Sequence, residues 1–176
     1  MQIRSAQVSD AAEIARVHVE CWRSTYAGLV PQTHLESLSC EQREKDWCTW
    51  LAPGNSSYIF VSENDEGQLM GFASAGRYRG RNRDFKAELY AIYILAAYQR
   101  QGIGRRLVRE IVAKLMQEEL PSMLTWVLAG NSSREFYERL GGKQIAEKEV
   151  EIGGVKLPAL AYGWRDVRRI LEQGKM

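Results

Sequence analysis

Hydrophobic residues recur along this chain with two different periods, and each period predicts a different kind of element. Between residues 103 and 115 the apolar positions are three or four apart, which places them on one face of a helix. These positions are Ile103, Leu107, Val108, Ile111 and Leu115. Residues 14–22 repeat in the same way and put His18 on or beside the buried stripe of a first helix, as a packed histidine. Residues 87–95, rich in Ile and Tyr, are typical of a strand.

The other segments complete a mixed order of strands and helices. We expect strands at 3–6, 57–63, 68–76, 123–129, 143–152 and 155–162, and a second, less regular helical region over 32–51. The spacing of Asp10 and Glu13 predicts the start of the first helix, and a capping box of Ser132 and Glu135 predicts the start of a later one. The pattern predicts an α/β (α+β) fold.

The segment Gln99–Gly104 lies between the strand at 87–95 and the helix that follows it. A helix start leaves N–H groups without partners and carries partial positive charge, so it can bind a phosphate. Gly102 and Gly104 let a bulky ligand approach these N–H groups closely. A Walker loop is excluded because Arg105 and Arg106 follow Gly104, and the dinucleotide fingerprint is excluded by Leu107.

Length and composition bound the class of protein. A chain of 176 residues with 45% hydrophobic and 26% charged residues predicts one domain over 1–176, ending in a short, polar and partly helical tail at 164–176. No apolar run is long enough for a membrane span, and the start lacks the apolar stretch of a secretory signal, so a cytoplasmic location is expected. Cys21, Cys40 and Cys48 lack the spacing of a disulfide framework or a metal site.

A formal net charge of +2 gives no reason to expect a nucleic-acid partner. Four arginines nevertheless lie between residues 77 and 83, in a loop between two predicted strands. This loop is interpreted first as a solvated surface. Contact with a phosphate or with an acidic ligand is the alternative.

Three segments together resemble the GNAT superfamily of N-acetyltransferases. Gln99–Gly104 is similar to its Q/R-x-x-G-x-G/A signature, Glu88–Ile94 to its fourth strand, and Asn131–Gly141 to its N-x-x-(S/A)-x-x-F-Y-E-x-x-G helix. The resemblance covers residues 87–142, in the family's order and spacing. It implies a mixed central sheet of about six to seven strands with flanking helices, in which parallel fourth and fifth strands splay apart around the pantetheine arm of acetyl-CoA.

The resemblance also implies which residues hold the co-substrate, with no metal. The pyrophosphate would lie on the segment that holds Gln99, Arg100, Gln101, Gly102, Ile103, Gly104 and Arg105. Ile92 and Ile94 would contribute from the strand, and the backbone N–H of Ile94 takes the position that points at the acetyl carbonyl in the family. Asn131 and Ser133 would help to hold the cofactor arm. Gln99 stands where Arg is more frequent, which removes one charge contact to the pyrophosphate.

Two side chains are candidates for the chemistry. Tyr137 matches the family's tyrosine that donates a proton to the departing thiolate, and its alternative is a core aromatic. Glu88 lies eleven residues before Gln99, the spacing of the catalytic glutamate in the histone acetyltransferase branch. Strict alternation would put Glu88, Tyr90, Ile92 and Ile94 on one strand face, where apolar neighbours would raise the pKa of a general base. A solvent-facing carboxylate, or one that only binds the acceptor, is the alternative.

In this family the acceptor is selected largely by the first helices and the last strands. Trp22 and Tyr26 are candidates for an aromatic wall that suits a small-molecule amine. A protein or peptide acceptor remains an alternative, and so does a sensor that binds acyl-CoA without catalysis. Dimers are frequent among the proteins that this chain resembles, so a homodimer is a further expectation.

Overall fold

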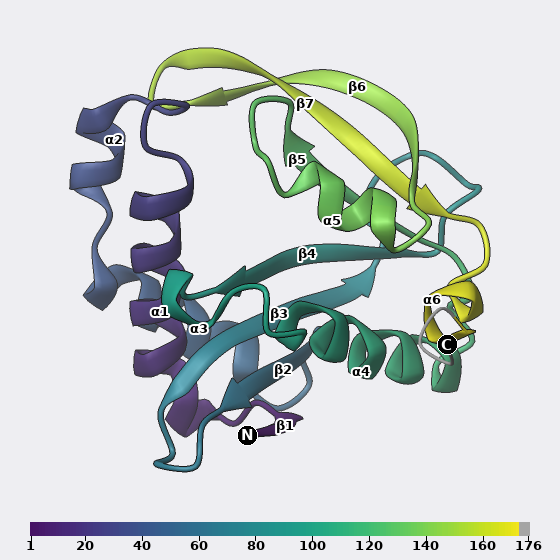
Figure 1. Cartoon of the computed structure of the whole chain (residues 1–176), viewed down its shortest axis with the longest axis horizontal. Helices are drawn as coiled ribbons and strands as arrows, with labels where there is room; N and C mark the ends of the chain where they lie inside the picture. The colour runs from purple at the N-terminus through teal and green to yellow at the C-terminus, as the bar shows by residue number, and fades with distance from the viewer. Residues whose placement is uncertain (173–176) are drawn as a thin grey trace.

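The computed structural model describes residues 1–172, which form a seven-stranded sheet in the order β1-β2-β3-β4-β5-β7-β6 (Figure 1). The strands are β1 (Gln2–Ser5), β2 (Tyr58–Glu63), β3 (Leu69–Arg77), β4 (Ala87–Ile94), β5 (Met123–Leu128), β6 (Lys143–Ile152) and β7 (Val155–Trp164). Neighbouring strands are antiparallel except for β4 and β5, which are parallel. This arrangement confirms the predicted fold class.

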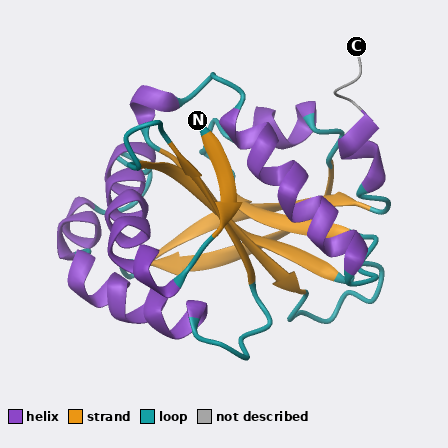
Figure 2. Ribbon diagram, turned by 90° about the horizontal axis from the view of Figure 1, so that it is seen from below, coloured by secondary structure: helices purple, strands orange, loops and turns teal. Residues whose placement is uncertain are grey.

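Helices cover both sides of the sheet, as Figure 2 shows. They are α1 (Ala11–Thr25), α2 (Gln32–Ser37), α3 (Cys40–Leu51), α4 (Ile103–Gln117), α5 (Arg134–Arg139) and α6 (Arg168–Glu172). Short 3₁₀ helices lie at Val8–Asp10 and Ala96–Tyr98. None of the helices in the described part of the chain is both long enough and apolar enough to cross a membrane.

Two apolar cores hold these layers together. On one side, which we call the α4 face, the predicted stripe of α4 is fully buried and packs on β3, β4 and β5. On the other side, the α1 face, Ile14 and Val17 of α1 pack with Trp47 of α3 on Phe72 of β3. Removal of apolar side chains from water is the main stabilising contribution on both faces. The sheet is therefore fixed between two helical layers.

Several predicted helix boundaries need correction. The region 32–51 is two helices, because Leu38 is extended and the Ser39 hydroxyl accepts a hydrogen bond from the Gln42 N–H at 3.2 Å, which starts α3. Asp10 does not cap α1 with its side chain. Its carboxylate instead accepts hydrogen bonds from the Gln7 N–H and from the Arg4 guanidinium, at 2.7 and 2.8 Å. Local contacts thus outcompete the predicted cap.

Residues 164–172, predicted as part of a polar tail, contribute buried side chains to the core. Trp164 closes β7, and α6 buries Ile170, while Val167 is fully buried between them. The Trp164 indole N–H donates to the carbonyl of Leu140 at 2.7 Å. Residues 173–176 of the predicted tail lie outside the described residues. The segment 164–172 therefore belongs to the core of the α4 face.

Candidate active site

The site lies where β4 and β5 separate. Among the described residues these strands pair at Ala87↔Met123 and Glu88↔Leu124 alone. Beyond this point the Leu95 N–H donates to the Met70 carbonyl of β3 at 2.9 Å. In an antiparallel ladder, backbone groups alternate between the two sides of a strand, so the N–H groups of Ile92 and Ile94 point away from β3 and toward β5. We call the region in which β4 and β5 are no longer paired the β4–β5 opening; the N–H groups of Ile92 and Ile94 face it.

The turn after β4 leads directly into the start of α4. Arg100 and Gly102 both have left-handed backbone conformations, with φ of 61° and 81°, and α4 begins at Ile103. The first-turn N–H groups of this fifteen-residue helix have no earlier turn to bind. Gly104 lies in that turn, where a Cβ would approach Ile94 and Phe136 to 3.2 Å. The turn thus needs glycine for its conformation and for its close packing.

Polar side chains of this turn bind backbone carbonyls. The Gln99 amide donates to the carbonyl of Ile94 at 2.9 Å, and the Gln101 amide donates to that of Ala97 at 3.2 Å. Arg100 is exposed, and Arg105 is half-buried. Gln99 therefore braces the end of β4 with its side chain.

Tyr137 lies inside the molecule beside the opening. Its ring is 6% exposed and packs against Phe136, Tyr162 and Trp164. Burial raises the pKa of Tyr137 above its ordinary value, while a hydrogen bond with Thr125 acts in the opposite direction. The hydroxyl therefore stays protonated and available as a donor. Its burial also shows that Tyr137 is at once a core aromatic and a candidate for the chemistry.

Asn131 and Ser133 shape the start of α5. The Asn131 side chain is buried, and its Oδ1 accepts a hydrogen bond from the Ser133 N–H at 2.8 Å. Ser133 is the N-cap residue, and its hydroxyl makes no capping bond. The predicted capping box of Ser132 and Glu135 is therefore wrong, because the helix begins one residue later and Asn131 supplies the oxygen. The sequence pattern located the helix but not the residue that starts it.

A bulge in β4 changes the face on which Glu88 lies. Ala91 pairs with Ser74 and Leu89 with Ala75, so β4 contains one extra residue at Tyr90. Ala87, Leu89, Ile92 and Ile94 consequently all contact the core of the α4 face, whereas Ala91 and Tyr93 pack on the α1 face. The predicted shared face of Glu88 with Ile92 and Ile94 is wrong. Glu88 instead points to the α1 face.

Glu88 is half-buried at the paired end of β4. Burial raises the pKa of its carboxyl, and the positive charges of Lys148 and Arg79 act in the opposite direction. The direction of this shift agrees with the prediction, although its apolar surroundings come from the other face of the sheet. A carboxylate with a raised pKa is a stronger base than an exposed one.

An aromatic cluster covers the α1 face beside the opening. The Trp22 and Tyr26 rings have centroids 4.7 Å apart and contact Tyr93 of β4 in one apolar cluster. Removal of the Tyr93 hydroxyl from water raises its pKa well above the ordinary value, and the adjacent Tyr26 raises it further. Sequence reasoning missed Tyr93. The signal was its position between Ile92 and Ile94, which places it on the opposite face of β4 from these two residues.

The β6–β7 hairpin closes this side of the molecule. Figure 1 shows it reaching over β5 to α2. At its tip, a Cβ on Gly153 would lie 2.8 Å from the Cβ of His34, and Val150 and Ile152 join the cluster of Tyr26. The aromatic cluster is therefore bounded by α1, α2, β4, β5 and the hairpin.

His18 is a packed histidine, as expected, but its hydrogen bond is to a side chain. Its Nδ1 accepts a hydrogen bond from the Trp47 indole N–H at 3.3 Å, and its ring stacks on Tyr93 with centroids 5.1 Å apart. Burial and the positive charge of Arg43 lower its pKa to about 3. His18 is therefore a neutral ring that stacks on Tyr93.

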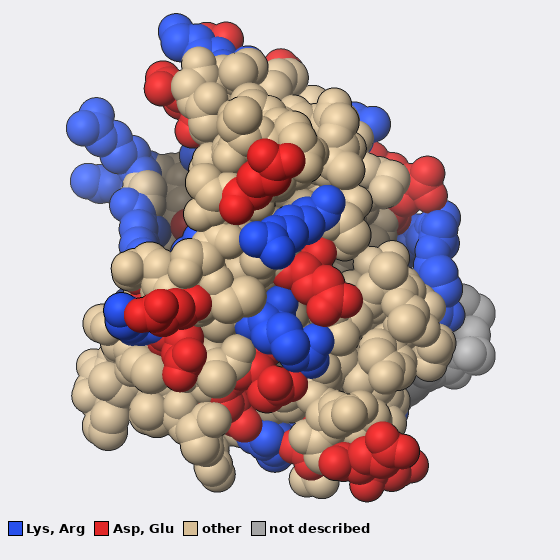
Figure 3. All heavy atoms as spheres, turned by 90° about the vertical axis from the view of Figure 1, so that its left-hand side faces the viewer, with Lys and Arg blue, Asp and Glu red and all other residues tan. Residues whose placement is uncertain are grey.

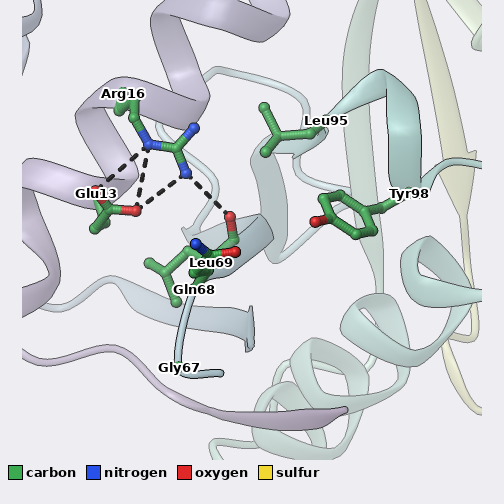
Figure 4. A pocket seen from close by; sticks show the side chains of 7 residues that line it. All are labelled: Glu13, Arg16, Gly67, Gln68, Leu69, Leu95 and Tyr98. Carbon is green, nitrogen blue, oxygen red and sulfur yellow. Dashed lines mark hydrogen bonds and ion pairs between the residues drawn. The ribbon is translucent and has the colours of Figure 1, made fainter. Parts of the chain in front are cut away.

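A cavity of about 400 Å³ lies elsewhere, beside the end of β4 that faces α1. Figure 4 shows its lining, in which Arg16 binds Glu13 and the carbonyl of Leu69. No predicted site residue lines it. On the neighbouring outer surface, at the left of Figure 1, acidic and basic side chains are interspersed (Figure 3). Within residues 1–172, no three His, Cys, Asp or Glu side chains gather as a metal site.

Comparison with known proteins identifies the family from the sequence and finds the same fold in solved structures. The profile of the family described as Acetyltransferase (GNAT) family matches residues 14–142. The chain is 38% identical over 165 residues to "Uncharacterized N-acetyltransferase YuaI" of Bacillus subtilis (strain 168), covering 94% of this chain and 93% of that protein. A ribosomal-protein-alanine N-acetyltransferase from Brucella melitensis superposes with a TM-score of 0.72 at 22% identity, over 93% of this chain and 99% of that one. A PaiA N-acetyltransferase from Thermoplasma acidophilum, solved with coenzyme A, gives 0.67 at 20% identity, over 93% and 98%.

Proposed function

Since the chain belongs to the acetyltransferase (GNAT) family, we propose that it moves the acetyl group of acetyl-CoA to the primary amine of a small molecule. The family and the relatives reported above carry the name of acetyltransferases. The observation that carries the assignment of a site is the opening between β4 and β5, with the helix start of α4 at one end and Tyr137 beside it.

Acetyl-CoA would lie in this opening as a substrate. The first-turn N–H groups of α4 would bind its pyrophosphate, because they combine free donors with the positive end of the helix dipole. The N–H groups of Ile92 and Ile94 would bind the pantetheine arm and the acetyl carbonyl, since they face the gap without a strand partner there. Donors aimed at the carbonyl oxygen also stabilise the negative charge that develops on it during attack.

Glu88 and Tyr137 would serve opposite ends of the reaction. Glu88 would take a proton from the acceptor ammonium, directly or through water, and the free amine would attack the thioester carbonyl. The C–N bond forms, the C–S bond breaks, and Tyr137 would donate its proton to the departing thiolate of CoA. The second proton of the attacking nitrogen would be lost to solvent and would restore Tyr137. The raised pKa values of both groups support these roles, since one must accept a proton near neutrality and the other must hold one.

The enclosure of the α1 face supports a small acceptor. The β6–β7 hairpin contacts α2 at Gly153 and leaves an aromatic cluster of Trp22, Tyr26 and Tyr93 beneath it. A surface groove for an extended peptide would instead need an open path along the sheet edge. Aromatic rings also bind cationic amines well.

Calorimetric titration with acetyl-CoA and CoA, combined with thiol release across polyamines, amino acids, aminoglycosides and peptides, tests the proposal. We expect binding of both nucleotides and turnover with a small amine. Turnover with peptides alone would replace the small acceptor with a protein acceptor. Binding without turnover on any amine would favour a sensor, and absence of acetyl-CoA binding would overturn the proposed site.

A further inference from the structure

Lys148 of β6 reaches across the sheet toward the proposed acceptor side. Its partner on β7 is Ala159, and the next position of β7 on that face is Ala161. Because both neighbours end at Cβ, the long lysine side chain can cross β7 to β5. Its Nζ lies 3.9 Å from the ring centroid of Trp126, within the range of a cation–π interaction. The ammonium is therefore held over β5, away from its own strand.

Trp126 lies on the same face of the sheet as Glu88. Glu88 pairs with Leu124, and side chains of one strand alternate, so Trp126 shares the face of Leu124. Trp126 also belongs to the cluster of Tyr26 and Tyr93. Lys148 is close enough to attract the Glu88 carboxylate electrostatically. The chain thus brings one of its own primary amines to the face on which an acceptor amine must lie.

We propose that Lys148 is an acceptor within the same molecule, so that the protein acetylates itself at this side chain. The inference rests on the proposed function of the β4–β5 opening. Glu88 accepts one proton from the Lys148 ammonium, and the free Nζ attacks the carbonyl carbon of acetyl-CoA. A C–N bond forms, the C–S bond breaks, and the thiolate leaves with a proton from Tyr137. The attacking nitrogen loses its second proton, which restores Tyr137 through solvent, and Glu88 releases the first proton to water. The products are Nε-acetyl-Lys148 and CoA.

Three other described lysines are held away from Trp126. Lys45 and Lys114 form ion pairs with Glu41 and Glu118 along their own helices. Lys156, on β7 near the tip of the hairpin, pairs across the strands with Glu151. Lys156 therefore serves as a matched control, because it is exposed on the same hairpin but lies beyond the Trp126 position.

The test is to incubate the full chain with acetyl-CoA and to follow acetylation by intact mass and by peptide mapping. We expect one acetyl group at Lys148. The first-order rate constant of its addition should not change when the protein is diluted at a fixed acetyl-CoA concentration. Lys148→Arg, which keeps the charge over Trp126, should lose this acetylation, and Lys156→Arg should keep it. Tyr137→Phe should slow it on the order of 100-fold, as expected for loss of an acid catalyst.

Three results would overturn the inference. They are labelling of several lysines at similar rates, a labelled fraction per unit time that increases with protein concentration, and no label at Lys148. Acetyl-CoA binding and thiol release with free amines are measured on the same samples. If these two succeed while Lys148 stays unmodified, self-acetylation alone fails. If acetyl-CoA does not bind, the proposed function fails with it. Melting curves establish that each variant is folded.

Discussion

The Thr125 hydroxyl of β5 donates a hydrogen bond to the Leu89 carbonyl of β4 at 3.0 Å. This bond lies directly after the last paired residues of the two strands, Glu88 and Leu124. Thr125 is buried, and its side chain also acts on Tyr137, whose pKa it lowers against the effect of burial. One hydroxyl therefore joins the point where the sheet opens to the proposed proton donor.

Replacing Thr125 with Val should destabilise the protein, because the shape is kept while the Leu89 carbonyl loses its buried partner. The expected loss in the free energy of unfolding is about 1–3 kcal/mol. Urea-induced unfolding measures it, with Thr125→Ser as the control that keeps the hydroxyl. Equal stability of the two variants would show that the bond contributes nothing.

Tyr137→Phe should lower turnover on the order of 100-fold while leaving acetyl-CoA binding nearly unchanged. The ring, which makes the packing contacts, is retained. Steady-state kinetics and calorimetry separate the two effects. The control is Tyr162→Phe, which removes a hydroxyl that binds Glu138 at 2.7 Å. Unchanged turnover in Tyr137→Phe would remove this residue from the mechanism.

Glu88 predicts the acid side of the pH profile. Its pKa is raised by burial, so kcat/KM should fall as pH decreases through a value above the ordinary glutamate range. Arg79 opposes this shift, and Arg79→Gln should therefore move the fall to higher pH. The Glu88→Gln variant should have a lower kcat/KM, and this value should not decrease at low pH as it does in the wild type. A profile that is the same in the wild type and in Glu88→Gln would exclude the carboxylate as the base.

His18 predicts how stability depends on pH. Its pKa falls from 6.5 to about 3 on folding, so only the unfolded chain binds a proton between these values. Stability should therefore decrease as pH falls from about 6.5 toward 3, by up to about 1.4 kcal/mol per pH unit from this group. Urea unfolding at several pH values measures the slope. His18→Gln should reduce it, and an unaltered slope in His18→Gln would contradict the assignment.

Gly102→Ala should affect both stability and co-substrate binding. Its φ of 81° is unfavourable for alanine, at a cost of about 1 kcal/mol, and it lies at the start of α4. Gly54→Ala is a matched control, because Gly54 has a φ of 89°, open space around it and a position away from the opening. Both variants should melt earlier, but only Gly102→Ala should raise the Kd for CoA. Equal affinity in both would separate the turn from cofactor binding.

Much of this fold was predictable because periodicity and glycine positions report on local structure. The stripe of α4, the turn at Gly102 and the order of the strands are confirmed. Family membership is confirmed as well. The roles of Tyr137 and Glu88 stay predictions.

Other features depend on contacts that no short segment contains. A strict period of two cannot show the extra residue at Tyr90, so it assigned Glu88 to the wrong neighbours. The meeting of Lys148 with Trp126 depends on the register of three strands and on two alanines between them. The hydrogen bond from the Ser133 N–H to Asn131 before α5 is local, but the serine and glutamate beside it matched a commoner pattern.

The extra residue at Tyr90 also restricts how this strand can evolve. Substitutions there keep the count of residues and leave Glu88 and Tyr93 on one side of the sheet, with Ile92 and Ile94 on the other. Deletion of that one residue would move the side chains that precede it in β4 to the opposite face of the sheet, relative to the side chains that follow it. We therefore expect homologous chains to vary at this position in residue type and to resist single-residue deletions.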